Sequence, residues 1–131
     1  MQADDNKKTV QQFYEASNRG DMETCLGLIA DDIRWTNIGT TSLSGTFEGK
    51  EELGQKLLGP LFGRLKEGIR TTVHRLIAEG DFVVAQTSGV AETIDGRAYN
   101  NTYCWIIRVR DGKIAEVTEY MDTALLSSTF D

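Results

Sequence analysis

The second half of the chain alternates between long strand-like segments and short turn signals, and this pattern limits the folds open to it. Four segments with strand-like composition and alternation cover residues 69–78, 82–93, 98–110 and 114–122. They are separated by "EGD" at 79–81, "DG" at 95–96 and "RDGK" at 110–113. Since such turn residues join neighbouring antiparallel strands, the four segments predict an antiparallel meander.

The first half is predicted to be mainly helical. The spacing of Val10, Phe13 and Tyr14 indicates a helix at 5–18, and Asp21 is expected to cap a second helix. A strand is predicted at 32–38, a short strand at "TFEG", and a third helix over 49–68 that Pro60 should kink or divide. Helices gathered on one side of an antiparallel sheet give an α+β fold. We expect one domain over residues 1–131, with a pocket between its layers.

Composition excludes several classes of function. The formal net charge of −6 argues against nucleic acid as a partner, because phosphate binding needs a basic surface. No apolar run approaches the roughly 18 residues of a membrane span, and the polar N-terminus does not resemble a signal peptide. A cytoplasmic protein is therefore expected. With two distant cysteines, Cys25 and Cys104, and a single histidine, His74, neither a disulfide nor a metal site is predicted.

Alternation along the strands predicts a common inner face. The side chains placed on it are Phe82, Val84, Gln86, Ser88 and Val90; Asn101, Tyr103, Trp105, Ile107 and Val109; Val117, Glu119 and Met121; and Ile33, Trp35 and Asn37. Each strand runs from an apolar end to an end that mixes aromatic and short polar groups. This composition is typical of a small-molecule cavity. The alternative is a packed core, in which Asn37, Gln86 and Ser88 bond one another and the aromatics and Tyr14 only pack.

Glu119 is the one carboxylate expected on this inner face. An apolar setting would raise its pKa toward neutrality, where a carboxyl can act as a general acid or base. The alternative is a structural carboxylate bonded to Asn37, Tyr103 or Tyr14, or one that reaches solvent. The pattern does not place His74 inside or outside.

Four segments resemble SnoaL-like proteins of the nuclear-transport-factor-2-like superfamily: "FYEASNRGDMETCLGLIADDIRWTNIG", "FEGKEEL", "IAEGDFVVAQTSG" and "NNTYCWIIRVRDGKIAEVTEYMDT". This superfamily includes ketosteroid isomerases, polyketide cyclases and limonene epoxide hydrolases. The resemblance covers nearly the whole chain. It implies a cone-shaped α+β fold in which a strongly curved sheet wraps three N-terminal helices around a deep cavity, and it implies a homodimer.

The resemblance also implies roles for individual residues. Tyr14 is similar to the oxyanion-donating tyrosine of steroid isomerases. By the same resemblance, Asn37 and either Trp105 or its neighbour stand where those enzymes have aspartates. The water-holding residues of limonene epoxide hydrolases match Glu119, Asn37 and Trp35, and their epoxide-protonating pair matches Gln86 and Ser88. Some polyketide cyclases use a carboxylate on the last strand, a role with which Glu119 is compatible.

The sequence thus predicts a cofactor-independent acid–base enzyme of isomerase, cyclase or hydrolase/dehydratase type, acting on a small, largely apolar substrate. Glu119 would be the acid or base, Asn37 would orient a water or carbonyl, and Tyr14 or Tyr103 would donate to an oxyanion. The substrate-binding residues would be Trp35, Gln86, Ser88, Asn101, Tyr103, Trp105 and Met121. Two alternatives stay open: a non-catalytic protein that binds a small hydrophobic ligand, and an assembly role in which the outer sheet face mediates dimerisation.

Overall fold

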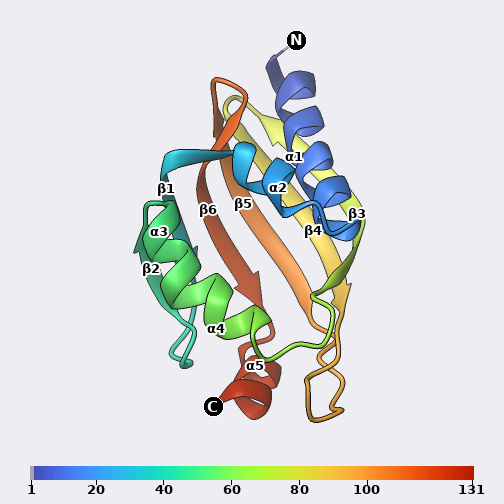
Figure 1. Ribbon diagram of the computed structural model, residues 1–131. Coiled ribbons are helices and arrows are strands. Elements are labelled where there is room, and N and C mark those ends of the chain that lie inside the picture. The colour runs from blue at the N-terminus through green and yellow to red at the C-terminus, as the bar shows by residue number, and fades with distance from the viewer. Residues whose placement is uncertain (1) are drawn as a thin grey trace.

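The computed structural model describes residues 2–131 and contains a single six-stranded sheet with helices on its concave side (Figure 1). The helices are α1 (Gln2–Asn18), α2 (Met22–Gly27), α3 (Lys50–Leu53), the π-helical turn η1 (Gly54–Leu58), α4 (Gly59–Phe62) and α5 (Thr123–Phe130). The strands are β1 (Ile29–Asn37), β2 (Gly45–Glu48), β3 (Arg70–Glu79), β4 (Phe82–Val90), β5 (Thr102–Arg110) and β6 (Lys113–Met121).

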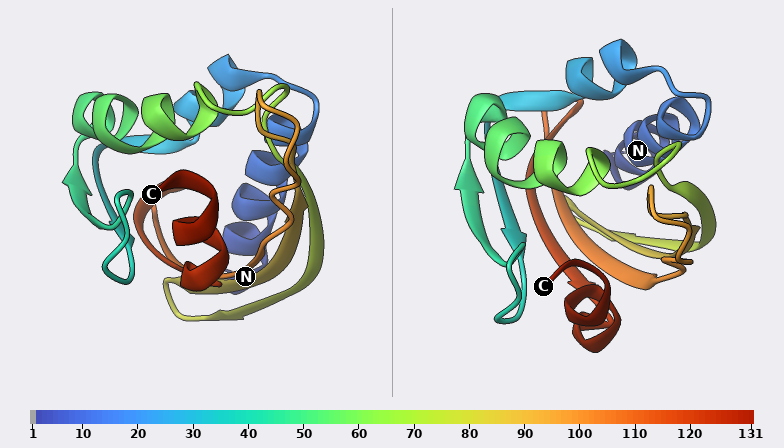
Figure 2. Two further views of the ribbon diagram at one scale, coloured as in Figure 1. Left: turned by 90° about the horizontal axis from the view of Figure 1, so that it is seen from below. Right: turned by 60° about the horizontal axis from the view of Figure 1, so that its bottom comes forward.

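The strand order in the sheet is β2-β1-β6-β5-β4-β3. The predicted antiparallel meander is confirmed, because β3, β4, β5 and β6 pair in succession with antiparallel neighbours. The first strand joins the other edge of the meander, where β1 pairs parallel with β6 and antiparallel with β2. Figure 2 shows the resulting sheet curling around the helices, with α5 across its lower end. The α+β fold class is therefore as predicted.

The first helix covers the concave face by burying one stripe of its side chains. In α1, Val10, Phe13 and Tyr14 recur at helical spacing and are all buried. The short helix α2 begins as predicted, since Asp21 Oδ1 accepts a hydrogen bond from the Thr24 amide at 3.1 Å.

The predicted third helix is divided, and it ends at Phe62 instead of continuing to residue 68. The amide of Gly59 bonds back to the Gly54 carbonyl, which gives the π-helical turn η1 just before Pro60. Because proline lacks an amide hydrogen, it cannot continue the regular ladder, and a short α4 follows. Leu53 and Leu57 anchor this segment in the core, whereas α4 has no buried residue.

Two features differ from the sequence prediction. Residues 123–130 form α5, a helix that was not predicted, and Asp122 caps it by accepting a hydrogen bond from the Leu125 amide at 3.1 Å. The strands predicted at 82–93 and 98–110 are shorter, because residues 91–101 form a hairpin extension held by the Glu92–Ala98 bridge. Among residues 2–131, no helix is long and apolar enough to cross a membrane.

Candidate functional site

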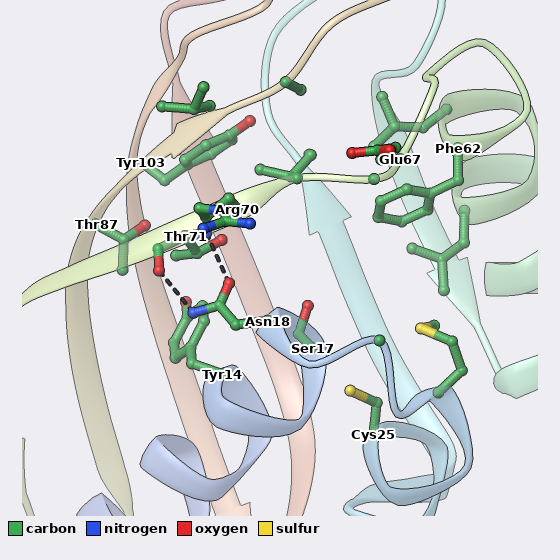
Figure 3. Close-up of a pocket in the computed structure, with 18 of the residues that line it drawn as sticks. Tyr14, Ser17, Asn18, Cys25, Phe62, Glu67, Arg70, Thr71, Thr87 and Tyr103 are labelled. Atoms are coloured by element: carbon green, nitrogen blue, oxygen red, sulfur yellow. Dashed lines mark hydrogen bonds between the residues drawn. The ribbon is translucent and has the colours of Figure 1, made fainter.

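A cavity of about 1290 Å³ lies between the helices and the concave face of the sheet. Its inner part is lined by Tyr14 from α1, Trp35 from β1, Thr87 from β4, Tyr103 and Trp105 from β5, and Glu119 from β6. Figure 3 shows Tyr14, Thr87 and Tyr103 around one side of this space. Five of these six residues were expected on the inner face or the first helix, and Thr87 was not.

Strand register explains why Glu119 lies among these side chains. Trp105 is its direct neighbour on β5, and Asn37 is its direct neighbour on β1. Two residues further along the same strands, and so on the same face, Ile107, Val117 and Trp35 form a buried apolar row. The Glu119 carboxylate therefore lies at the inward-facing position next to this buried apolar row, on the side toward the cavity.

Glu119 accepts a hydrogen bond from Trp35 Nε1 to its Oε1 at 3.1 Å. The accessible part of the Glu119 side chain faces the cavity, because the carboxyl lies among its lining residues. Burial disfavours the charged form and raises the pKa of Glu119 to about 7, while the indole N–H groups of Trp35 and Trp105 oppose this rise. Within residues 2–131, Trp105 Nε1 forms no hydrogen bond of normal geometry. Near neutral pH the carboxyl is thus populated in both protonation states.

Aromatic rings form the wall beside the carboxyl. The Trp105 ring centroid lies 4.8 Å from that of Trp35, 5.3 Å from that of Tyr14 and 6.1 Å from that of Phe13. Since all four side chains also line the cavity, the two tryptophans both pack against neighbours and present a surface to a ligand. We therefore expect the fluorescence of these indoles to change when a ligand occupies the cavity.

Two phenols supply neutral hydrogen-bond donors. Burial raises the pKa of Tyr14 and of Tyr103 well above the ordinary value for tyrosine, and the nearby Glu119 carboxylate raises both further. Among residues 2–131, no group makes a hydrogen bond of normal geometry with the buried Tyr14 hydroxyl. A buried donor without an acceptor costs about 1–3 kcal/mol. A ligand oxygen at this position would supply the missing acceptor.

The predicted inner face of β4 is wrong by one residue. Gln86 and Ser88 lie on the outer face, where Ser88 Oγ and His74 Nε2 are 2.8 Å apart. The buried side chains of β4 are instead those of Val83, Ala85 and Thr87. Alternation misled here because Phe82 and Val84 make the outer face apolar as well. Neither Gln86 nor Ser88 lines the cavity, so neither is placed to contact a substrate there, and the pair that the resemblance matches to the epoxide-protonating residues faces away from the cavity.

Asn101 is buried, but it does not line the cavity. Its side chain instead forms hydrogen bonds that hold neighbouring segments of the chain together. Its Nδ2 donates to the Tyr99 hydroxyl at 3.0 Å and to the Asp122 carbonyl at 3.1 Å. Its Oδ1 accepts from the amides of Thr102 and Asp122 at 2.8 and 3.0 Å. With every polar atom engaged, this amide has no group left for a ligand.

Asn37 and Met121 also lie outside the cavity lining. Asn37 Nδ2 donates to the Leu43 carbonyl at 2.9 Å, and its buried Oδ1 has no hydrogen-bond partner among residues 2–131. Met121 is half-buried and packs against the core beside Tyr103, its neighbour in register. Asn37 therefore adjoins Glu119 through the sheet, whereas Met121 is a packing residue.

The outer part of the cavity is lined by residues that the strand patterns could not reveal. They come from α2 and from the η1–α4 segment: Met22, Cys25, Leu26, Leu57, Leu58, Leu61 and Phe62. For the residues of the η1–α4 segment, the sequence signal that could have revealed them was the apolar spacing of the third predicted helix. Within residues 2–131, no group of three or more His, Cys, Asp or Glu side chains is arranged to hold a metal ion.

Comparison with known proteins gives a family and a fold. A family model described as the SnoaL-like domain matches residues 10–117. No curated protein sequence matches the chain. Solved structures described as NTF2-like proteins share the fold, as the sequence resemblance implied.

Three solved structures illustrate the structural similarity. Bal32a, from a soil-derived mobile gene cassette, has 21% identity over 100% of both chains, with a TM-score of 0.89. TerC, co-crystallised with polyporic acid, has 23% identity over 95% of this chain and 96% of that chain, with a TM-score of 0.81. An LEH-like epoxide hydrolase from M. tuberculosis has 21% identity over 99% of this chain and 92% of that chain, with a TM-score of 0.79. At these identities the similarity establishes the fold alone.

Proposed function

The chain belongs to the SnoaL-like domain family, and we propose that it is a cofactor-independent enzyme of general acid–base type. Its substrate in this proposal is a largely apolar molecule that carries a carbonyl group. The observation that carries the proposal is Glu119, a carboxyl whose pKa burial raises to about 7, at the inner end of a cavity of about 1290 Å³. A base with a pKa near the working pH is well suited to move a proton to and from carbon.

The proposed step begins with ionised Glu119. The carboxylate removes a proton from the carbon beside the carbonyl, the C–H electron pair forms a C=C bond, and the carbonyl π electrons move to oxygen. Because Tyr14 and Tyr103 stay protonated in this setting, their hydroxyls are the donors available to stabilise the resulting enolate. Return of the proton from Glu119 to the same carbon restores the ketone. In a substrate with a β,γ C=C bond the enolate is a dienolate, and return of the proton to its γ-carbon moves the double bond into conjugation, which completes an isomerisation and regenerates the carboxylate.

The solved relatives support a small-molecule site of this kind. TerC was crystallised with polyporic acid, and the M. tuberculosis protein is an LEH-like epoxide hydrolase. Epoxide hydrolysis is less well supported for this chain, because Gln86 and Ser88, which match the epoxide-protonating residues by resemblance, face away from the cavity. Proton transfer at the carbon beside a carbonyl requires only groups that line the cavity.

Exchange of α-protons with solvent tests the proposal without knowledge of the natural substrate. A simple methyl ketone in D₂O is incubated with the protein, and loss of the α-proton signals is followed by NMR. Glu119→Gln should slow the protein-dependent exchange by about 100-fold or more. Glu116→Gln is the matched control, since Glu116 lies on the same strand, pairs with Arg108 at 2.7 Å and is outside the cavity lining. Exchange by Glu119→Gln at the wild-type rate would contradict the assignment.

A non-catalytic ligand-binding protein is the second candidate. The hydrogen bond from Trp35 to Glu119 favours it, because this bond engages one carboxylate oxygen within the protein. A binding protein would quench or enhance the fluorescence of the cavity tryptophans with the same ketones but would leave their α-protons in place. The two assays together therefore separate the candidates.

We also propose that the protein forms a homodimer through the outer face of the sheet. Ile77, Val84 and Ile106 are neighbours in register across β3, β4 and β5, and two of them are 54% and 37% exposed. Phe82 and Tyr120, 45% and 44% exposed, extend the same face. Contiguous exposed apolar surface of this kind marks interaction sites. Ile106→Glu should convert a dimer to a monomer in sedimentation velocity, and Ile94→Glu, in the exposed 91–101 hairpin, should leave it unchanged.

A further inference from the structure

The large apolar side chains that remain exposed fall mostly into two groups. One group occupies the outer face of the sheet, as described above. The other lines the cavity and consists of Met22, Leu26, Phe62 and Val90, which are 49%, 41%, 36% and 60% exposed. Three of these four belong to the short helices α2 and α4, and we call Met22, Leu26 and Phe62 the apolar rim. Scattered exposed apolar residues are normal, but these three share one cavity.

The apolar rim is not required by the core of the protein. Met22 and Leu26 are four residues apart, so they share one face of α2, and Cys25 is the only buried residue of that helix. Phe62 ends α4, which contains no buried residue. Figure 3 shows Phe62 and the α2 residue Cys25 lining the same outer part of the pocket. These side chains therefore offer apolar surface that residues 2–131 leave partly uncovered.

Further apolar side chains line the cavity that the rim shares with the inner site. These are Leu57, Leu58, Leu61 and Ile69, so the cavity offers a largely apolar, leucine-lined path to a ligand that reaches both. The volume of about 1290 Å³ exceeds the roughly 300–1,000 Å³ of pockets that hold drug-sized molecules. A compact ligand bound at Glu119 would leave this outer part filled with water against apolar walls.

Charges at the mouth balance. Arg19 pairs with Asp21 at 3.2 Å, and Lys66 pairs with Glu92 at 3.0 Å. The remaining charged residues of the lining at this end are Glu67 and Arg70, which are exposed and of opposite sign. The mouth therefore presents no net charge, and the outer part of a ligand needs no ionised group to complement it.

We propose that the apolar rim is a second subsite and that the ligand is an elongated, uncharged hydrocarbon chain with a carbonyl group at one end. The carbonyl end lies beside Glu119, which is the part of this inference that rests on the proposed function. The hydrocarbon chain follows the leucine-lined path and covers Met22, Leu26 and Phe62 at the mouth. The rim thus sets the preferred length of the ligand.

A series of linear methyl ketones tests this assignment. Binding is measured by the fluorescence of Trp35 and Trp105, below the solubility limit of each ketone. Each added methylene should tighten the Kd by about fourfold while the chain stays inside the cavity. The variants are Phe62→Ser and the double variant Met22→Ser with Leu26→Ser, whose native side chains are already exposed. Ile94→Ser, an exposed apolar residue outside the cavity lining, is the control.

The expected result is a dependence on chain length. Rim variants should bind ketones of about six carbons within about twofold of wild type, and should bind ketones of about twelve carbons about tenfold more weakly. Equal weakening of short and long ketones, or no weakening of either, overturns the rim subsite. If the wild-type protein binds long ketones more tightly than short ones, as expected, and still catalyses no α-proton exchange, that result contradicts the proposed function but leaves the rim subsite standing. Failure of the proposed function and failure of the rim subsite are therefore distinguishable.

Discussion

Trp35 Nε1 donates a hydrogen bond to Glu119 Oε1 at 3.1 Å, and the two residues are 84 positions apart in the sequence. The parallel pairing of β1 with β6 brings them together. The Trp35 indole favours the ionised carboxylate, whereas burial favours the neutral acid. Burial is the larger of the two effects, so the pKa of Glu119 rises to about 7. The balance between these two effects determines how Glu119 behaves near neutral pH.

Stability should fall as the pH rises through the titration of Glu119. Since its pKa is raised from 4.5 to about 7, the folded protein holds this proton more tightly than the unfolded chain does. The stabilisation is fully present below about pH 4.5 and is lost progressively as the pH passes about 7. Glu119→Gln should therefore gain about 2 kcal/mol over wild type between about pH 5 and about pH 8, measured by urea unfolding. An equal difference at both pH values would show that the carboxyl is not responsible.

Removal of the Trp35 donor should raise the pKa of Glu119 further. A hydrogen bond to a charged group contributes roughly 1.5–3 kcal/mol, so Trp35→Phe should raise that pKa by about one unit. Trp105→Phe is the matched control, because Trp105 Nε1 makes no hydrogen bond of normal geometry with any group in residues 2–131, and its effect should be smaller. NMR titration of the Glu119 carboxyl carbon in each variant gives the comparison. A larger shift in Trp105→Phe would reverse the assigned roles of the two indoles.

Thr87 and Ser88 provide a direct test of which face of β4 lines the cavity. Thr87 is buried and lines the cavity, whereas Ser88 lies on the outer face beside His74. Thr87→Val keeps the shape but removes the hydroxyl, and it should change the affinity for methyl ketones by about threefold or more. Ser88→Ala should leave that affinity unchanged. The opposite pattern would restore the face predicted from alternation.

Asn101 should matter for stability and not for ligand contact. Asn101→Ala removes four hydrogen bonds: two to the backbone of Asp122 at the start of α5, one to Tyr99 and one to the amide of the adjacent Thr102. We expect a loss of about 2–4 kcal/mol in the free energy of unfolding. Thr102→Ala, at the exposed neighbouring position, should cost less than about 0.5 kcal/mol. A normal stability for Asn101→Ala would contradict the structural role.

The parts of the fold that local signals encode were predicted from the sequence. Turn residues revealed the meander of β3 to β6, and alternation along β6 placed Glu119 on the inner face. The parallel pairing of β1 with β6 leaves no local signal, because it joins segments about 80 residues apart. It nevertheless creates the contact between Trp35 and Glu119.

The errors have physical causes at particular residues. Both faces of β4 are apolar, since its outer face carries Phe82 and Val84, so alternation alone could not choose Thr87 over Ser88. Asn101 follows the inward alternation of β5, but it precedes the first residue of that strand and bonds to backbone groups. A polar residue just outside the end of a strand can hydrogen-bond to backbone groups and stabilise the fold. Periodicity does not distinguish such a residue from one that contacts a ligand.

The titration of Glu119 in the wild-type protein tests the central claim most directly. With the carboxyl carbon labelled, NMR follows its chemical shift across the pH range, and Glu119→Gln identifies the signal by its absence. The proposed acid–base role predicts a midpoint near pH 7, as burial in the cavity requires. A midpoint near 4.5, the ordinary value for glutamate, would contradict that role and leave the cavity as a binding site.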